Sequence, residues 1–281
     1  MTSSTPTTEY VLGTDHAEFV RLGLQHRLWS DLALDTWRRC GARPGAVALD
    51  VGCGPGHATT DLAQIVGVGG RPGRVVGVDE SPGFIETCRS LAAARGLTNV
   101  RASVGDVQRL DELALDEGPF DLAYARWVLC FVKDPSAVAR GVARRLRPGG
   151  FLGVNDYFDY ETMALAPRRP AFERVIRAVG ASWRASGGDP DIVGRLPRIL
   201  HDAGLELVHL AVDQRVCQPG QTMWAWPDTF WANYVPRLLQ QGHITRGEHD
   251  AFFDEWRAAS SDPRAFMMLP AVFQVIARKP G

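Results

Sequence analysis

Three glycines at alternate positions, Gly52, Gly54 and Gly56, follow an apolar run and precede a stretch compatible with a helix. Glycines at such a strand-to-helix turn let the backbone approach a ligand closely. Asp50 precedes them near the end of the apolar run. A dinucleotide fingerprint, GxGxxG, would place its third glycine where this sequence has His57, so the observed GxGxG disfavours a nicotinamide site without excluding one.

Two further carboxylates follow later apolar runs. Asp79 closes the run RVVGVD, and Asp106 lies in VGDV after the next run. With the glycine turn, and with FDLAYARWVL and LRPGGFL downstream, they form an ordered series. Over about residues 45–155 this series resembles the class I S-adenosylmethionine-dependent methyltransferases. A single glycine motif is weak evidence, whereas several motifs in the proper order are specific.

The resemblance implies how a methyl donor would be held. The turn from Gly52 to Gly56 would receive the amino-acid end of S-adenosylmethionine, and Asp79 would accept hydrogen bonds from both ribose hydroxyls. Asp106 would hold the adenine amino group while the Val107 amide donates to the ring. The expected cofactor-binding residues at the sheet are Asp50, Gly52, Gly54, Gly56, Asp79, Glu80, Asp106, Val107 and Ala125.

Residues for the methyl acceptor are expected at the carboxyl ends of the fourth and fifth strands, where doubly wound sheets bind ligands. The sulfonium methyl is intrinsically reactive, so alignment matters more than obligatory catalytic groups. The catalytic candidates are Arg126, Asp156 and Tyr157. Asp156 could act as a base or a counter-ion, or cap a turn. Arg126 could anchor an acidic acceptor or form a structural ion pair, and Trp127 is expected in the core.

An N-terminal helix is expected before the first strand, beginning at Asp15 with a capping box to Glu18. Arg21, Gln25 and Trp29 share one of its faces. In methyltransferases that this sequence resembles, such a helix folds over the cofactor. Arg21 or Gln25 could then hold the methionine carboxylate, and Tyr10 could close the same pocket. The alternative is an amphipathic helix whose polar residues face water.

The elements that would position these residues alternate regularly. Apolar runs at 46–51, 74–79, 99–104, 120–125 and 151–155 are separated by helical stretches. Parallel strands need crossover connections, so the fold class is α/β, a doubly wound, Rossmann-like and mostly parallel sheet. The runs at 205–214 and 271–278 are expected to form an antiparallel hairpin at its edge, which makes seven strands.

The expected organisation has five parts. They are a flexible tail (1–9), an N-terminal helical cap (10–44), a cofactor-binding core (45–158), a helical insertion or lid (159–204), and a terminal hairpin (205–281) that holds an aromatic helical insertion (219–265). The tryptophans of the aromatic insertion are expected to pack a helix more than to contact a flat acceptor.

Composition restricts the partners and the location. The 281 residues carry 31 basic and 32 acidic side chains, a net charge of −1, which does not favour nucleic acid. No apolar run is long enough to cross a membrane. Five cysteines without CxxC spacing, after a start that lacks a secretion signal, indicate a reduced cytoplasmic protein. The histidines lack metal-ligand spacing.

These observations predict a metal-independent enzyme that transfers a methyl group from S-adenosylmethionine to a small molecule and releases S-adenosylhomocysteine. The expected substrate is a secondary metabolite or metabolic intermediate. Two alternatives stay open: an NAD(P)-dependent oxidoreductase on a similar sheet, and a protein that binds the methyl donor without catalysis. A homodimer also stays open.

Overall fold

The computed structural model describes residues 16–70, 73–115 and 118–281, so the expected tail (1–9), Tyr10 and Asp15 lie outside the described residues. The helices are α1 (His16–Leu28), α2 (Ser30–Arg39), α3 (His57–Val66), α4 (Pro82–Ala94), α5 (Pro135–Arg145), α6 (Pro170–Ala185), α7 (Leu196–Asp202), α8 (Ala225–Gln240) and α9 (Arg246–Ser260). Short 3₁₀ turns are η1 (Val68–Gly70), η2 (Val107–Glu112), η3 (Tyr160–Thr162), η4 (Ile192–Gly194) and η5 (Thr222–Trp224).

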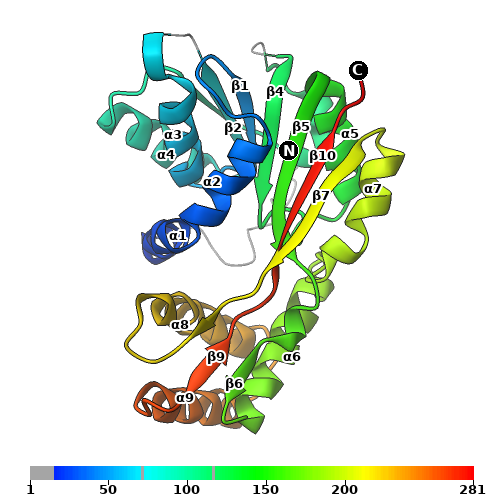
Figure 1. Ribbon diagram of the computed structural model, residues 1–281. Coiled ribbons are helices and arrows are strands. Elements are labelled where there is room, and N and C mark those ends of the chain that lie inside the picture. The colour runs from blue at the N-terminus through cyan, green and yellow to red at the C-terminus, as the bar shows by residue number, and fades with distance from the viewer. Residues whose placement is uncertain (1–15, 71–72, 116–117) are drawn as a thin grey trace, which may run out of the picture.

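Seven strands form the main sheet in the order β3-β2-β1-β4-β5-β10-β7. They are β1 (Val47–Val51), β2 (Arg74–Asp79), β3 (Val100–Val104), β4 (Phe120–Arg126), β5 (Leu146–Tyr157), β7 (Glu206–Asp213) and β10 (Val272–Arg278). The first five are parallel, and β10 runs antiparallel between β5 and β7. This confirms the predicted fold class and the antiparallel pair at the edge (Figure 1).

Helices cover both faces of this sheet. Figure 1 shows α2, α3 and α4 on one side and α5 and α7 on the other. The first layer buries Trp37 and Leu62, and the second buries Val138 and Val142. Because both faces are covered, the central strands are continuous apolar runs rather than alternating ones. The helix α7 belongs to the segment expected as a lid (159–204), but it contacts α5 and β7 and so packs on the main sheet.

The strand order reverses between β1 and β4. Strand β1 pairs with β2 on one side and with β4 on the other, and the helices that follow β1 and β4 lie on opposite faces. At such a switch point the loops after the strands separate and leave a crevice at their carboxyl ends. The glycine turn follows β1 there, and Trp127 follows β4.

Beyond the carboxyl ends lies a second group of elements, made by α6, α8, α9 and a three-stranded sheet in the order β6-β9-β8 (Figure 1). Its strands are β6 (Ala164–Ala166), β8 (Val216–Cys217) and β9 (Phe266–Met268). The helical character of both insertions was predicted, but this sheet was not. Strands of two or three residues are too short for alternation to show in a sequence.

The N-terminal segment departs from the prediction of one helix. It breaks at Trp29 into α1 and α2, and Trp29 is fully buried. The indole contacts Trp127 and Trp226 edge-on, at centroid distances of 5.8 and 5.0 Å, and lies beneath Arg215. The break lets α2 pack on β5 and β10 while α1 lies against α8. In the described part of the chain, no helix combines the length and apolar character that crossing a membrane requires.

Candidate functional site

The glycine turn after β1 adopts a conformation that only glycine takes without strain. Gly52 has φ 66° and Gly56 has φ 84°. A Cβ on Gly56 would lie 2.3 Å from the Cys88 Sγ, and a Cβ on Gly52 would lie 2.5 Å from a Val128 methyl. Gly56 then caps α3, whose first turn begins at His57. The turn therefore presents its backbone at the head of α3.

A cavity of about 660 Å³ opens beside this turn, and we call it the main cavity. Its volume lies in the range of small-molecule sites, roughly 300–1,000 Å³. Of the expected cofactor residues, the structure brings together in its lining Gln25, Asp50, Gly52, Gly54, Asp79, Glu80, Asp106 and Val107. Ala125 and Gly56 do not line it, because Ala125 is buried in the sheet and Gly56 is packed against Cys88.

Asp79 joins the glycine turn to the end of β2. The Gly54 amide donates to its Oδ2 at 2.8 Å, and the Ser81 amide donates to its Oδ1 at 2.9 Å. Burial raises the pKa of this carboxyl above its usual value, and the two amides oppose that shift. Each oxygen keeps acceptor capacity beyond its one amide. A rigid carboxylate with two outward acceptors is suited to a vicinal diol.

Two other carboxylates of the main cavity are also held by local donors. The Thr59 hydroxyl donates to Asp50 Oδ2 at 2.6 Å, and complete burial raises the pKa of Asp50 to about 6. Asp106 accepts hydrogen bonds from the amide and the side chain of Gln108, at 2.8 and 3.1 Å, and so caps η2. Both side chains are fixed before any ligand arrives.

Arg126, at the end of β4, lies on the main-cavity side. Its Nη2 donates to His26 Nδ1 at 2.9 Å, and His26 Nε2 contacts Asp61 Oδ2 at 2.8 Å. Since a guanidinium only donates, His26 accepts at Nδ1 and donates from Nε2, as the neutral form. Burial lowers the pKa of His26. Within the described chain, Arg126 Nη1 is buried and has no hydrogen-bond partner.

His57, on the first turn of α3, lines the same cavity. Its ring stacks on Phe19 at 5.3 Å and faces His26 at 6.1 Å. Burial, followed by the neighbouring His26, lowers the pKa of His57 to about 4. The ring is therefore neutral near pH 7. The sequence does not indicate that the two histidines lie together, because they are far apart in the chain and meet only where α1 crosses α3.

A second cavity, which we call the aromatic chamber, lies between α1, α6 and α8. Gln25, Trp127 and Phe131 line both it and the main cavity, so the two share a wall. Eight aromatic side chains line the chamber: Trp127, Phe131, Tyr157, Tyr160, Trp183, Trp226, Phe230 and Trp231. Trp127, Trp226 and Trp231 were expected mainly as core residues. They are buried as core residues are, but they also face this chamber.

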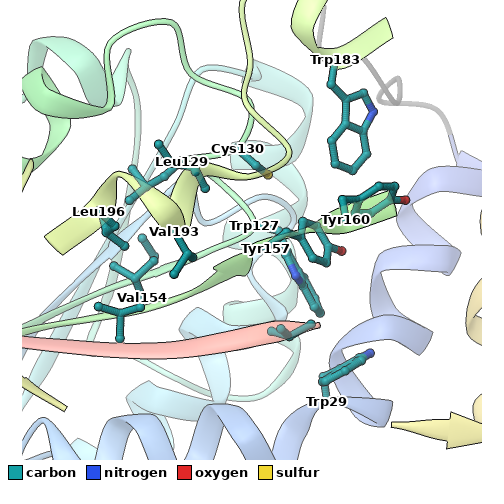
Figure 2. Close-up of a cluster of buried hydrophobic side chains, with 14 of the residues drawn as sticks. Trp29, Trp127, Leu129, Cys130, Val154, Tyr157, Tyr160, Trp183, Val193 and Leu196 are labelled. Atoms are coloured by element: carbon teal, nitrogen blue, oxygen red, sulfur yellow. The ribbon is translucent and has the colours of Figure 1, made fainter. Parts of the chain in front are cut away.

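The aromatic side chains form a continuous row. Figure 2 shows Trp183, Tyr160, Tyr157, Trp127 and Trp29 one after another from α6 to the start of α2. Successive ring centroids lie 4.8, 5.1, 6.0 and 5.8 Å apart. The row comes from four separate segments, and no periodicity within one segment marks it. By contrast, Trp224 stacks on Trp256 at 4.7 Å and belongs to the core, as expected.

Arg21 lies in the chamber and not in the main cavity, which corrects its expected place beside the cofactor. Its Nε and Nη2 donate to the two carboxylate oxygens of Glu18, both at 2.7 Å, and its Nη1 donates to Gln25 Oε1 at 2.8 Å. Trp226 Nε1 donates to the same Gln25 oxygen, and Asn233 donates to Glu18. The polar face of α1 is thus turned inward and not toward water.

Asp156 does not lie where a general base would have to be. It is fully buried and lines neither the main cavity nor the chamber. The amides of Cys130 and Tyr157 donate to its two oxygens, at 3.2 and 3.0 Å. Burial raises its pKa to about 6. The structure therefore gives Asp156 the turn-fixing role, because it ties the loop after β4 to the end of β5. Its neighbour Tyr157 points into the chamber.

The described residues contain no group of three histidine, cysteine, aspartate or glutamate side chains placed to hold a metal ion. All five cysteines are unpaired and buried.

Comparison with known proteins gives consistent results. A family described as a methyltransferase domain matches residues 42–182, half of the chain. Nocamycin O-methyltransferase of Saccharothrix syringae is 38% identical over 112 residues, which cover 40% of this chain and 38% of that protein. Trans-aconitate 2-methyltransferase of Methylobacterium radiotolerans is 31% identical over 159 residues, 56% of this chain and 53% of that protein. The chain thus spans about half or less of these relatives.

A crystal structure of a putative methyltransferase from Bacillus halodurans superposes with a TM-score of 0.59. The match covers 89% of this chain and 99% of that one at 19% sequence identity, so the likeness concerns the fold alone.

Proposed function

Because this chain belongs to the methyltransferase-domain family, we propose that it is an S-adenosylmethionine-dependent methyltransferase that acts on a small-molecule acceptor. One observation carries the proposal. The main cavity brings the glycine turn together with carboxylates from three separate segments of the chain, and it shares a wall with the aromatic chamber. A donor site and an acceptor site in contact are what a direct transfer requires.

The residues of the main cavity fit the methyl donor. Asp79 offers an acceptor on each oxygen for the ribose hydroxyls, and Asp106 with the Val107 amide lies where the adenine would bind. At Gly52 a Cβ would clash with the Val128 side chain, so only glycine lets the turn pass beside the cavity there. Arg126 Nη1, buried without a partner among the described residues, suits the methionine carboxylate.

When bound, S-adenosylmethionine supplies an electrophilic methyl group on its sulfonium. The protein's part is to align the acceptor and exclude water. Trp127, Gln25 and Phe131 form the wall where donor and acceptor meet, and Tyr157 lines the acceptor side. Arg21 orients Gln25 through a hydrogen bond of 2.8 Å. We propose transfer by in-line displacement, without a metal, and release of S-adenosylhomocysteine.

The same proposal includes the setting of the enzyme. A net charge of −1 supports a small molecule as partner in preference to nucleic acid. Five unpaired cysteines support a cytoplasmic location, and we propose no membrane partner. Light scattering on the purified protein distinguishes a monomer from the homodimer that the sequence leaves open.

Calorimetry with the purified protein tests the donor site. We expect S-adenosylhomocysteine to bind with a dissociation constant in the micromolar range and NADH to give no heat of binding. Incubation with S-adenosylmethionine and a pool of small metabolites is then expected to release S-adenosylhomocysteine. Binding of NADH without binding of S-adenosylhomocysteine would contradict the proposal and favour an oxidoreductase. Tight donor binding without any release would favour a non-catalytic protein.

A further inference from the structure

We propose that the aromatic chamber takes an uncharged, flat, conjugated acceptor that presents an oxygen atom to indole N–H groups of its wall. This inference rests on the proposed function, since it calls the ligand of the chamber the methyl acceptor. Three separate observations support it: the charge of the chamber lining, the unpaired donors in its wall, and its shape.

The one charge in the described lining of the chamber is paired with a carboxylate. Among its lining residues in the described chain, Arg21 alone is charged, and Glu18 holds that guanidinium through two hydrogen bonds of 2.7 Å. Both side chains are almost fully buried. Asn233 also donates to Glu18, at 2.7 Å. A carboxylate or phosphate on the ligand would enter apolar surroundings and face a cation already paired, which is costly for the ligand charge.

A cationic acceptor is disfavoured by the way the rings are packed. Ammonium groups bind the open face of an aromatic ring. In this chamber one face of Trp127 is stacked on Tyr157 at 6.0 Å, and the indole is also stacked on Trp226 at 5.9 Å. Figure 2 shows Tyr157 beside Trp127 in the aromatic row. The faces of Trp127 that take part in these stacks are covered and do not receive an ammonium group.

Buried donors of the chamber wall lack a hydrogen-bond partner among the described residues. The indole nitrogens of Trp127 and Trp231 are buried and have no hydrogen-bond partner in the described part of the chain. These side chains are 7% and 1% exposed. A buried N–H without a partner is unfavourable, and a ligand oxygen within reach would relieve it. A carbonyl, ether or hydroxyl oxygen fits this requirement, whereas an ammonium group would oppose it.

Shape favours a flat ligand. The chamber encloses about 40 Å³, so an acceptor must separate facing side chains to enter. A planar ring does this with the least displacement, because it can stack where two aromatic rings part. Trp127 itself has φ 52°, a conformation that bulky residues rarely adopt, and its amide donates to the Asn155 carbonyl at 2.9 Å. Such strain, retained at the wall between two cavities, is typical of a functional position.

Three probes with the same ring system and different charges test the inference: 1-naphthol, 1-naphthoate and 1-naphthylmethylammonium. Quenching of tryptophan fluorescence, with the protein saturated with S-adenosylhomocysteine, gives their affinities. We expect 1-naphthol to bind at least tenfold more tightly than either charged probe. Equal or tighter binding of the carboxylate or of the ammonium would overturn the inference. The affinity for S-adenosylhomocysteine is measured separately, and its absence would contradict the proposed function, not the probe order.

Two matched variants locate the binding. Phe230 lines the chamber from α8, while Phe253 on α9 is similarly half-buried but lies outside it. We expect Phe230→Ala to weaken 1-naphthol binding at least fivefold and Phe253→Ala to leave it unchanged. Equal effects of the two substitutions would place the probe elsewhere and overturn the inference.

A third variant tests the charge argument. Glu18→Gln removes the carboxylate charge that lies 2.7 Å from Arg21, so 1-naphthoate is expected to gain at least tenfold in affinity relative to 1-naphthol. An unchanged ratio in the folded variant would show that Glu18 does not neutralise the chamber, and would overturn this part of the reasoning. If Glu18→Gln does not fold, the affinities of the three probes and the comparison of Phe230→Ala with Phe253→Ala still test the inference.

Discussion

Replacing Asp79 with asparagine is the most direct test of the donor site. The substitution keeps the size of the side chain and removes its charge. In the structure each carboxylate oxygen accepts one backbone amide, from Gly54 at 2.8 Å and from Ser81 at 2.9 Å. One further acceptor position on each oxygen is left for a ribose hydroxyl. Asparagine offers one acceptor oxygen in place of two, so it loses one of the expected hydrogen bonds to the ribose.

The size of the effect follows from the kind of bond that is lost. A hydrogen bond to a charged group contributes about 1.5 to 3 kcal/mol. At about 1.4 kcal/mol for each factor of ten, the affinity for S-adenosylhomocysteine should fall by about 10- to 140-fold in Asp79→Asn. Because burial raises the pKa of Asp79, affinity of the unaltered protein should also fall as the pH is lowered and this carboxyl becomes protonated.

Calorimetry measures this loss, and Asp121→Asn is its control. Asp121, at the beginning of β4, also accepts a strand amide, from Val47 at 2.9 Å, and pairs with Arg147. It lies at the opposite edge of the sheet from the glycine turn. The control should bind S-adenosylhomocysteine as the unaltered protein does. Unchanged affinity in Asp79→Asn, or an equal loss in Asp121→Asn, would refute the assignment of Asp79 to the ribose.

Three other predictions concern stability and the glycine turn. Burial raises the pKa of Asp156 to about 6, so between about pH 4 and 6 this carboxyl is protonated in the folded state and ionised in the unfolded state. Its contribution to the free energy of unfolding therefore falls by about 3 kcal/mol as the pH rises from about 4 to 6. In urea unfolding, Asp156→Asn should lack that decrease. The effect of His57 on stability has the opposite sign. Because its pKa is lowered to about 4, the unfolded state binds the proton more readily, and the free energy of unfolding rises by at most about 3 kcal/mol as the pH rises from about 4 to 6.5. His57→Asn should lose this rise. Gly56→Ala should abolish binding of S-adenosylhomocysteine in calorimetry, because its Cβ would lie 2.3 Å from Cys88 Sγ, whereas Gly204→Ala, with similar φ but open space, should bind normally.

The order of elements in the core was predictable because each part of it is marked locally. Five apolar runs became five parallel strands, and the glycine turn lies between the first strand and its helix as expected. Ser81 caps α4 and Pro82 begins it, with the Ser81 hydroxyl accepting from the Phe84 amide at 3.3 Å. Strand ends, caps and glycine turns depend on neighbouring residues, so a sequence shows them directly.

The roles of single polar residues were harder to predict. Asp156 has the same residue type as Asp79 and also lies at the carboxyl end of a strand, yet its carboxylate accepts from the amides of Cys130 and Tyr157. Arg21 was expected beside the cofactor and instead pairs with Glu18 in the chamber. The Cys130 amide comes from the loop after β4, and the chamber around Arg21 is built in part from α6 and α8, so local patterns do not contain that information.

By itself the amino-acid sequence determined the alternation of strands and helices, the glycine turn, and the carboxylates that end its neighbouring strands. These features depend on residues within one turn or one strand of each other. Only the tertiary structure decided which side chains share a cavity, since the aromatic chamber draws its wall from α1, β5, α6 and α8 and from the turn after β4. Trp127 lies at the boundary between the two cavities because distant segments pack around it. Its neighbours Tyr157 and Trp226 come from β5 and α8 and not from its own strand.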